Sequence, residues 1–105
     1  MRRGTPDFAP GEGIKYSNSN YILLGLIAEQ VTGNGIEQEI GDRIIGPLGL
    51  SGTSFPTTAE MPEPYMHGYA GVAPGDPLVD STESTPAVPW ASGAMISTLA
   101  DMRTW

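Results

Sequence analysis

The first clear pattern along the chain is a run of apolar residues at helical spacing between residues 18 and 31. One face carries Tyr21, Leu24, Ala28 and Val31. The other faces are also largely apolar, with Ile22, Leu23, Leu26 and Ile27. A helix that is apolar nearly all round is typical of a protein interior. Ser17 or Asn18 can cap its start and Gly33 can end it in a left-handed conformation, so residues 16–33 are predicted to hold a buried helix.

A second helix is predicted over residues 36–45, inside a segment that runs from 34 to 50. Its acidic residues are expected to form a solvated face: Glu37, Glu39 and Asp42. Gly46-Pro47 is expected to end it, because proline lacks a backbone donor and clashes with the preceding turn. The predicted core of the chain combines the apolar faces of the two helices and consists of Tyr21, Leu24, Ala28, Val31, Ile36, Ile40 and Ile44.

The remaining segments are interrupted by proline and glycine. Residues 1–15 are predicted to form a lead-in loop, and residues 51–90 a long excursion with at most short strands, near 66–72. A loop of that length in a compact domain is expected to serve a site or to pack on another part of the protein. The last segment, 91–105, starts a helix near Ser97 or Thr98, with Thr98 and Asp101 as a capping box. No stop signal precedes Trp105, so this helix is expected to be truncated.

Composition excludes several classes of partner. The chain has 105 residues, the size of one domain, and a net charge of −7. Nucleic acids and anionic membranes require basic surface, so neither is an expected partner. No apolar run reaches the roughly 18 residues of a membrane span, and Met1-Arg2-Arg3 is not followed by the apolar region of a signal peptide. The absence of cysteine excludes disulfides and thiolate metal sites.

The usual catalytic patterns are missing from the 105 residues. A nucleophile elbow Gly-x-Ser-x-Gly is approached only at residues 49–53, where the fifth position is Thr53. His67 is the only histidine, and nothing near it in sequence is placed to orient it, so it is interpreted as a turn or packing residue. Glu60 and Glu63 show no metal-ligand spacing, and no glycine-rich turn suits a phosphate. The sequence therefore predicts no metal and no cofactor.

An ordered series of short motifs spans nearly the whole chain. It begins with Phe8-x-Pro10-Gly11, then Tyr16-Ser17-Asn18, then a long helix that ends in Thr32-Gly33. It continues with Pro47-Leu48-Gly49-Leu50, Thr53, Phe55, Gly68-Tyr69 and the stretch from Ser92 to Asp101. A single Tyr-x-Asn recurs by chance, whereas the ordered series is far more specific. In this order the chain resembles the serine β-lactamase and D-alanyl-D-alanine carboxypeptidase superfamily, in its class C β-lactamase, DD-peptidase and esterase branch.

The resemblance implies a mainly α fold with long loops, the helical subdomain of the β-lactamase/transpeptidase-like α/β fold. Residues 1–105 would be this helical domain, and the flanking α/β sandwich, absent here, would be its intramolecular partner. Of the family's three motifs only Tyr-x-Asn is present. Ser-x-x-Lys is excluded because the sole lysine, Lys15, has Glu12 three residues before it, and no Lys-Thr-Gly or His-Thr-Gly occurs.

The resemblance also implies roles for two residues. Tyr16 would act as general base and acid, and Asn18 would hydrogen-bond the substrate carbonyl and the motif lysine. The substrates would be small acyl compounds: a β-lactam, a D-Ala-D-Ala peptide or an ester. Family members often act in the cell envelope or outside the cell. From the residues alone, the favoured interpretation is that Tyr16 is a hydrophobic staple and Asn18 a helix cap.

Three functions remain open from the sequence. The first is an inactive fragment of a serine hydrolase whose other motifs lie outside these residues. The second is a non-catalytic binding or scaffold module built on the same helical domain. The third is a small stand-alone hydrolase with unconventional residues.

Overall fold

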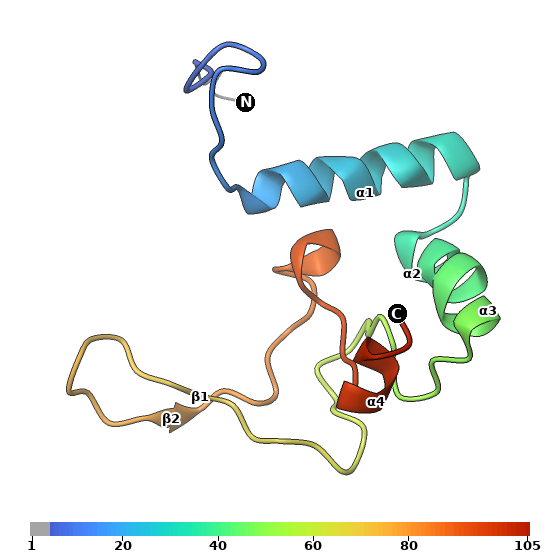
Figure 1. Ribbon diagram of the computed structural model, residues 1–105. Coiled ribbons are helices and arrows are strands. Elements are labelled where there is room, and N and C mark those ends of the chain that lie inside the picture. The colour runs from blue at the N-terminus through green and yellow to red at the C-terminus, as the bar shows by residue number, and fades with distance from the viewer. Residues whose placement is uncertain (1–4) are drawn as a thin grey trace.

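The computed structural model describes residues 5–105. The Met1-Arg2-Arg3 segment, which bears on the signal-peptide prediction, lies outside the described residues, as does the start of the lead-in loop. Most regular structure is helical, as predicted. Helix α1 spans Asn18–Thr32, followed by α2 (Ile36–Ile40), α3 (Gly46–Leu48) and α4 (Leu99–Met102). Strands β1 (Tyr69–Ala70) and β2 (Val79–Asp80) complete the set (Figure 1).

The ends of α1 follow from local chemistry. Ser17 is the N-cap, and its hydroxyl accepts a bond from the Ser19 N–H at 3.3 Å. Gly33 ends the helix at φ 78°, a left-handed conformation that glycine adopts without steric cost, and its N–H donates to the Glu29 carbonyl. The predicted long helix is confirmed, and of the two capping candidates the structure selects Ser17.

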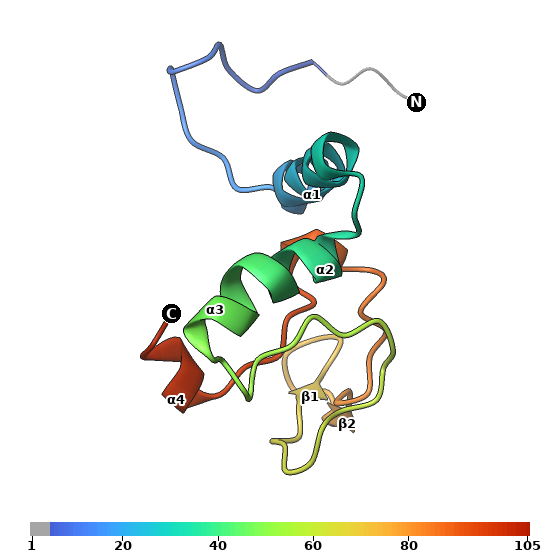
Figure 2. The ribbon, with the colours of Figure 1, turned by 90° about the vertical axis from the view of Figure 1, so that its right-hand side faces the viewer.

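The predicted stop at Gly46-Pro47 is wrong. A π-helical turn, Gly41–Ile45, joins α2 to α3, so that the three segments form one continuous rod (Figure 2). Pro47 is the second residue of α3, directly after the π turn. The rod ends instead at Gly49, whose φ is 65°. The wider π turn therefore accommodates the proline that an unbroken α-helix would reject.

Helix α1 packs on the 3₁₀ turn Trp90–Ser92 through a glycine. Gly25 is buried, and a Cβ there would lie 2.7 Å from the Ala91 Cβ and 3.0 Å from the Trp90 ring. The missing side chain is therefore what lets the turn approach the helix. The turn lies directly beneath α1 in Figure 1.

The predicted core is wrong for much of α1. Leu24 is 61% exposed and Val31 is 79% exposed, as are other apolar residues of this helix: Leu23, Leu26 and Ile27. The buried apolar residues are instead Leu50, at 1% exposure, and Ala94. Within residues 5–105, only one side of α1 has a neighbour, formed by the 90–92 turn and α2. The apolar pattern predicted burial, but most of the residues that it marked on α1 are exposed within residues 5–105.

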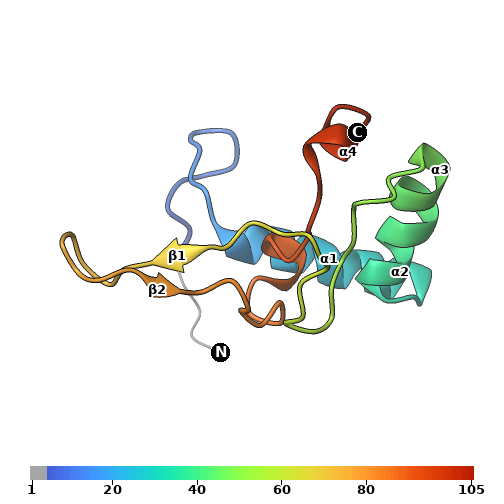
Figure 3. The same ribbon diagram turned by 90° about the horizontal axis from the view of Figure 1, so that it is seen from below.

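Two further features organise the long excursion. Strands β1 and β2 pair antiparallel, with Tyr69 opposite Asp80, in a hairpin that projects from the helices (Figure 3). The 66–72 region thus contains the short strand that the sequence predicted. Farther along, Ser54 and Ile96 exchange two backbone hydrogen bonds, at 2.9 and 3.0 Å, which join the loop after α3 to the segment before α4. No helix within residues 5–105 has the length and apolar character needed to cross a bilayer.

Candidate active site

Tyr16 and Asn18 lie where the lead-in loop meets α1. Tyr16 precedes the cap residue Ser17, and Asn18 is the first residue of the helix. Both side chains are exposed, Tyr16 to 69%. The Tyr16 ring contacts the Tyr21 ring, with centroids 5.6 Å apart and planes tilted by 40°. Both residues therefore lie exposed at the same end of α1.

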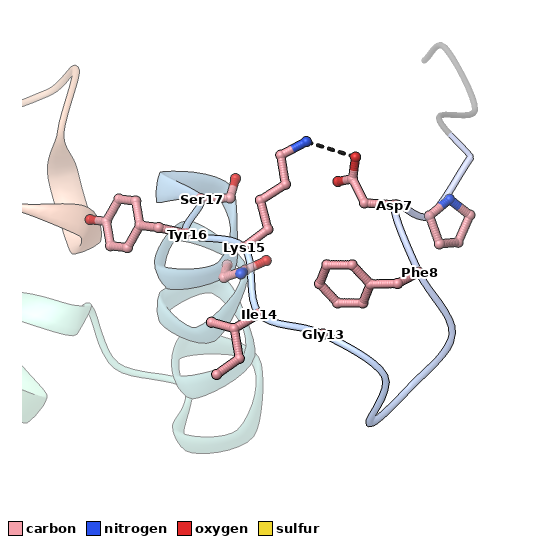
Figure 4. Close-up of a pocket in the computed structure, with 9 residues that line it drawn as sticks. Asp7, Phe8, Gly13, Ile14, Lys15, Tyr16 and Ser17 are labelled. Carbon is pink, nitrogen blue, oxygen red and sulfur yellow. Dashed lines mark hydrogen bonds and ion pairs between the residues drawn. The ribbon is translucent and has the colours of Figure 1, made fainter.

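A cavity of about 650 Å³ adjoins this helix end. The lead-in loop folds over it, and its lining includes Asp7, Phe8, Lys15 and Tyr16. Phe8 packs against Gly13, where a Cβ would lie 2.9 Å from the phenyl ring. The loop is closed by an ion pair between Lys15 Nζ and Asp7 Oδ1 at 2.7 Å (Figure 4).

Lys15 does not replace the lysine of the missing Ser-x-x-Lys motif. Figure 4 shows its side chain directed to Asp7, while the Tyr16 ring points to the other side of the backbone. Within the described residues, the phenol of Tyr16 thus has no lysine beside it. General-base catalysis by Tyr16 would need a cation and a nucleophile from elsewhere.

His67, by contrast, does have an orienting partner, so that part of the sequence interpretation was wrong. Its Nδ1 lies 2.9 Å from Asp80 Oδ2, and Thr82 also bonds to the Asp80 carboxylate. Hairpin pairing brings Asp80 across from the strand that His67 precedes, a relation invisible in local sequence. The ring is also flanked by Tyr65 and Tyr69. His67 therefore makes its contacts within the hairpin region, with its side chain 51% exposed.

The Asp80 carboxyl titrates far below its usual range. The hydroxyl and backbone N–H of Thr82, together with His67, lower the pKa of Asp80 from 3.8 to about 2. A lowered pKa means that the carboxylate stabilises the hairpin above pH 4 and that this contribution is lost as the pH falls toward 2. We expect the backbone amide chemical shifts of Gly68 and Ser81 to move toward the values of an unpaired loop as the pH falls from 4 to 2. In Asp80→Asn this transition should vanish; its persistence would show that another group holds the hairpin.

The acidic face of the second helix is only partly solvated. Glu39 is buried to 9% exposure, and its carboxylate accepts bonds from Asn34 and from Arg43. These partners lower the pKa of Glu39, Asn34 most strongly. Glu39 therefore connects the α1–α2 loop to the rod. Within residues 5–105, no cluster of three or more histidines or carboxylates can hold a metal ion.

Comparison with known proteins identifies the family. The β-lactamase family matches residues 1–105. The chain belongs to the β-lactamase family. A putative D-alanyl-D-alanine carboxypeptidase of Escherichia coli (strain K12) is 41% identical over 56 residues, which cover 52% of this chain and 13% of that protein. The predicted resemblance to the serine β-lactamase and transpeptidase superfamily is thereby confirmed.

Solved structures agree with this assignment. A D-stereospecific amidohydrolase from Streptomyces sp. matches 96% of this chain and 30% of its own, with a TM-score of 0.90 and 38% identity. The D-amino acid amidase from Ochrobactrum anthropi SV3, complexed with L-phenylalanine amide, matches 90% of this chain and 29% of its own, with a TM-score of 0.76 and 36% identity. The predicted fold class is confirmed. The chain spans 13% to 19% of the length of the first curated relatives and about 30% of these solved chains.

Proposed function

We propose that this chain is the Tyr-x-Asn part of a serine hydrolase that works through an acyl-enzyme. The observation that carries the proposal is the placement of Tyr16 and Asn18, both exposed at the start of α1. The ordered motif series and the matches to amide-hydrolysing structures support the reaction class. The nucleophilic serine and its lysine would come from residues outside these 105.

In the proposed chemistry, Tyr16 first accepts a proton and then donates it. In its phenolate form, the Tyr16 oxygen takes the proton of the serine hydroxyl as the serine oxygen attacks the substrate carbonyl carbon. Tyr16 then gives that proton to the leaving nitrogen or alcohol oxygen as the scissile bond breaks. Asn18, two residues away, donates its amide N–H to the substrate carbonyl. The electrons of the broken bond remain on the leaving group, and the acyl group remains on the serine.

The substrate is a small acyl compound: a D-Ala-D-Ala peptide, a β-lactam, an ester or an amide of a D-amino acid. The last class is supported by two neighbours, whose names specify a D-stereospecific amidohydrolase and a D-amino acid amidase. All four classes share a carbonyl carbon that a serine can attack.

The uncovered faces of α1 support an intramolecular partner. Contiguous exposed apolar surface on this scale marks a region that contacts something else. Its residues are Leu23, Leu24, Leu26, Ile27 and Val31, which are 50–79% exposed. We propose that the remaining part of the β-lactamase fold covers them, with this chain as its helical domain.

Covalent labelling tests the proposed function. We expect the purified 105-residue chain to form no adduct with a fluorophosphonate probe or a β-lactam in intact-mass spectrometry, because a base without its nucleophile retains little acyl-transfer activity. The full-length protein should gain one adduct, on the serine of a Ser-x-x-Lys motif. An unlabelled full-length protein would favour the non-catalytic module. A stoichiometric adduct on a serine of the short chain, abolished by Tyr16→Phe, would instead establish a stand-alone hydrolase.

A further inference from the structure

The ring of Tyr16 needs support from outside its own backbone. Tyr16 precedes the N-cap, so it lies outside the hydrogen-bonded ladder of α1, and the next residue, Ser17, is extended at φ −152° and ψ 128°. Its side chain is 69% exposed. A general base must hold its oxygen within a few tenths of an ångström of the productive position, and this requires neighbours that fix its rotamer.

Tyr21 provides such a contact. It lies in the first turns of α1, five residues after Tyr16, and its ring is tilted by 40° to the Tyr16 ring at a centroid distance of 5.6 Å. That distance and tilt fall within the range of favourable aromatic pairs. The contact restricts the ring of Tyr16 on one side, while the residue stays 69% exposed.

Tyr21 is itself held on a rigid element. Tyr21 is 45% exposed, and it lines an apolar groove of about 370 Å³ together with Leu24, Gly25 and Trp90. Gly25 is the residue that the Trp90 turn contacts most closely. The contact between α1 and the Trp90–Ser92 turn therefore holds Tyr21 in place, and Tyr21 in turn contacts Tyr16.

We propose that Tyr21 is the positioning residue for Tyr16, the residue that holds the phenol of the general base in its reactive orientation. This inference rests on the proposed function of Tyr16. It assigns the Tyr21 ring, and not its hydroxyl, as the group that matters. It also makes Tyr21 dispensable once the Tyr16 hydroxyl is gone.

A double-mutant cycle in the full-length protein tests the proposal. We expect Tyr21→Leu to lower kcat about tenfold with KM within about twofold, because the base is misplaced and substrate binding is retained. Tyr21→Phe keeps the ring and should stay within about twofold of the wild type. In the Tyr16→Phe background, Tyr21→Leu should cause no further loss. Tyr69→Leu, the same substitution in the exposed hairpin, is the matched control for the general cost of losing a tyrosine ring.

The outcomes separate the two proposals. If Tyr21→Leu lowers kcat by the same factor in the wild type and in the Tyr16→Phe background, Tyr21 is merely structural. An unchanged kcat in Tyr21→Leu would also overturn its positioning role. If Tyr16→Phe alone leaves the rate unchanged, the proposed function of Tyr16 fails instead. Tyr21→Met, which fills the groove with a flexible apolar chain, gives the same test if the leucine variant does not fold.

Discussion

Replacing Asp101 by alanine should lower the free energy of unfolding by about 2–4 kcal/mol. Its Oδ2 accepts bonds from the Gly52 N–H at 2.8 Å and from the Thr53 hydroxyl at 2.6 Å. Thr53 is 6% exposed and Asp101 is 9% exposed, so the alanine variant removes two hydrogen bonds from a carboxylate that is largely shielded from water. Urea denaturation of the full-length protein measures the loss.

Two matched variants sharpen this prediction. Asp101→Asn keeps an oxygen that can accept both bonds and should cost about 1 kcal/mol. Asp42→Ala removes an exposed acid from the helical rod and should stay within about 0.5 kcal/mol of the wild type. If Asp101→Ala is no more harmful than Asp42→Ala, the connection between the 50–54 loop and α4 is not what holds these segments together.

The sequence predicted the elements whose signals are local. The apolar spacing of α1, its cap at Ser17 and its end at Gly33 lie within one stretch of chain, and the structure matches them. The capping box at Thr98 is half confirmed: its hydroxyl accepts the Asp101 N–H at 3.2 Å. The Asp101 carboxylate instead bonds to Gly52 and Thr53, nearly fifty residues earlier, and no local pattern announces that contact.

The failures have a common physical origin in tertiary context. Pro47 predicts the end of a helix unless the preceding turn widens to the π form. No feature of the sequence predicts that wider turn. His67 gains Asp80 only through hairpin pairing. Leu24 lies at helical spacing with other apolar residues and was therefore predicted to be in the core, but it is 61% exposed. Apolar spacing identifies the apolar face of a helix and does not show which element covers that face.

For the candidate site, too, the sequence predicted some features and missed others. The motif series drew attention to Tyr16 and Asn18, and the structure places both at the exposed start of α1. Their catalytic roles remain a proposal. The ring contact of Tyr21 with Tyr16 was not predicted, because a spacing of five residues across a helix start belongs to no standard helical pairing.

Tyr16→Phe should have the largest effect on function. In the full-length protein, removing the phenol oxygen takes away the proposed acceptor of the serine proton and leaves the ring and its contact with Tyr21 in place. We expect acylation to slow by roughly 10²–10⁴, the usual contribution of a general base. Folding should be intact, since Tyr16 is 69% exposed. Tyr69→Phe, which deletes the same oxygen from an exposed hairpin residue, should leave acylation unchanged.

The most direct measurement of the central claim is the single-turnover acylation rate of full-length wild type and Tyr16→Phe, followed with a β-lactam, an ester and a D-amino acid amide. We predict a loss of roughly 10²–10⁴ in the acylation rate with whichever of these substrates the wild type accepts, and circular dichroism spectra that do not change. An acylation rate equal to that of the wild type would contradict it, and would leave Tyr16 as a packing residue at the start of α1.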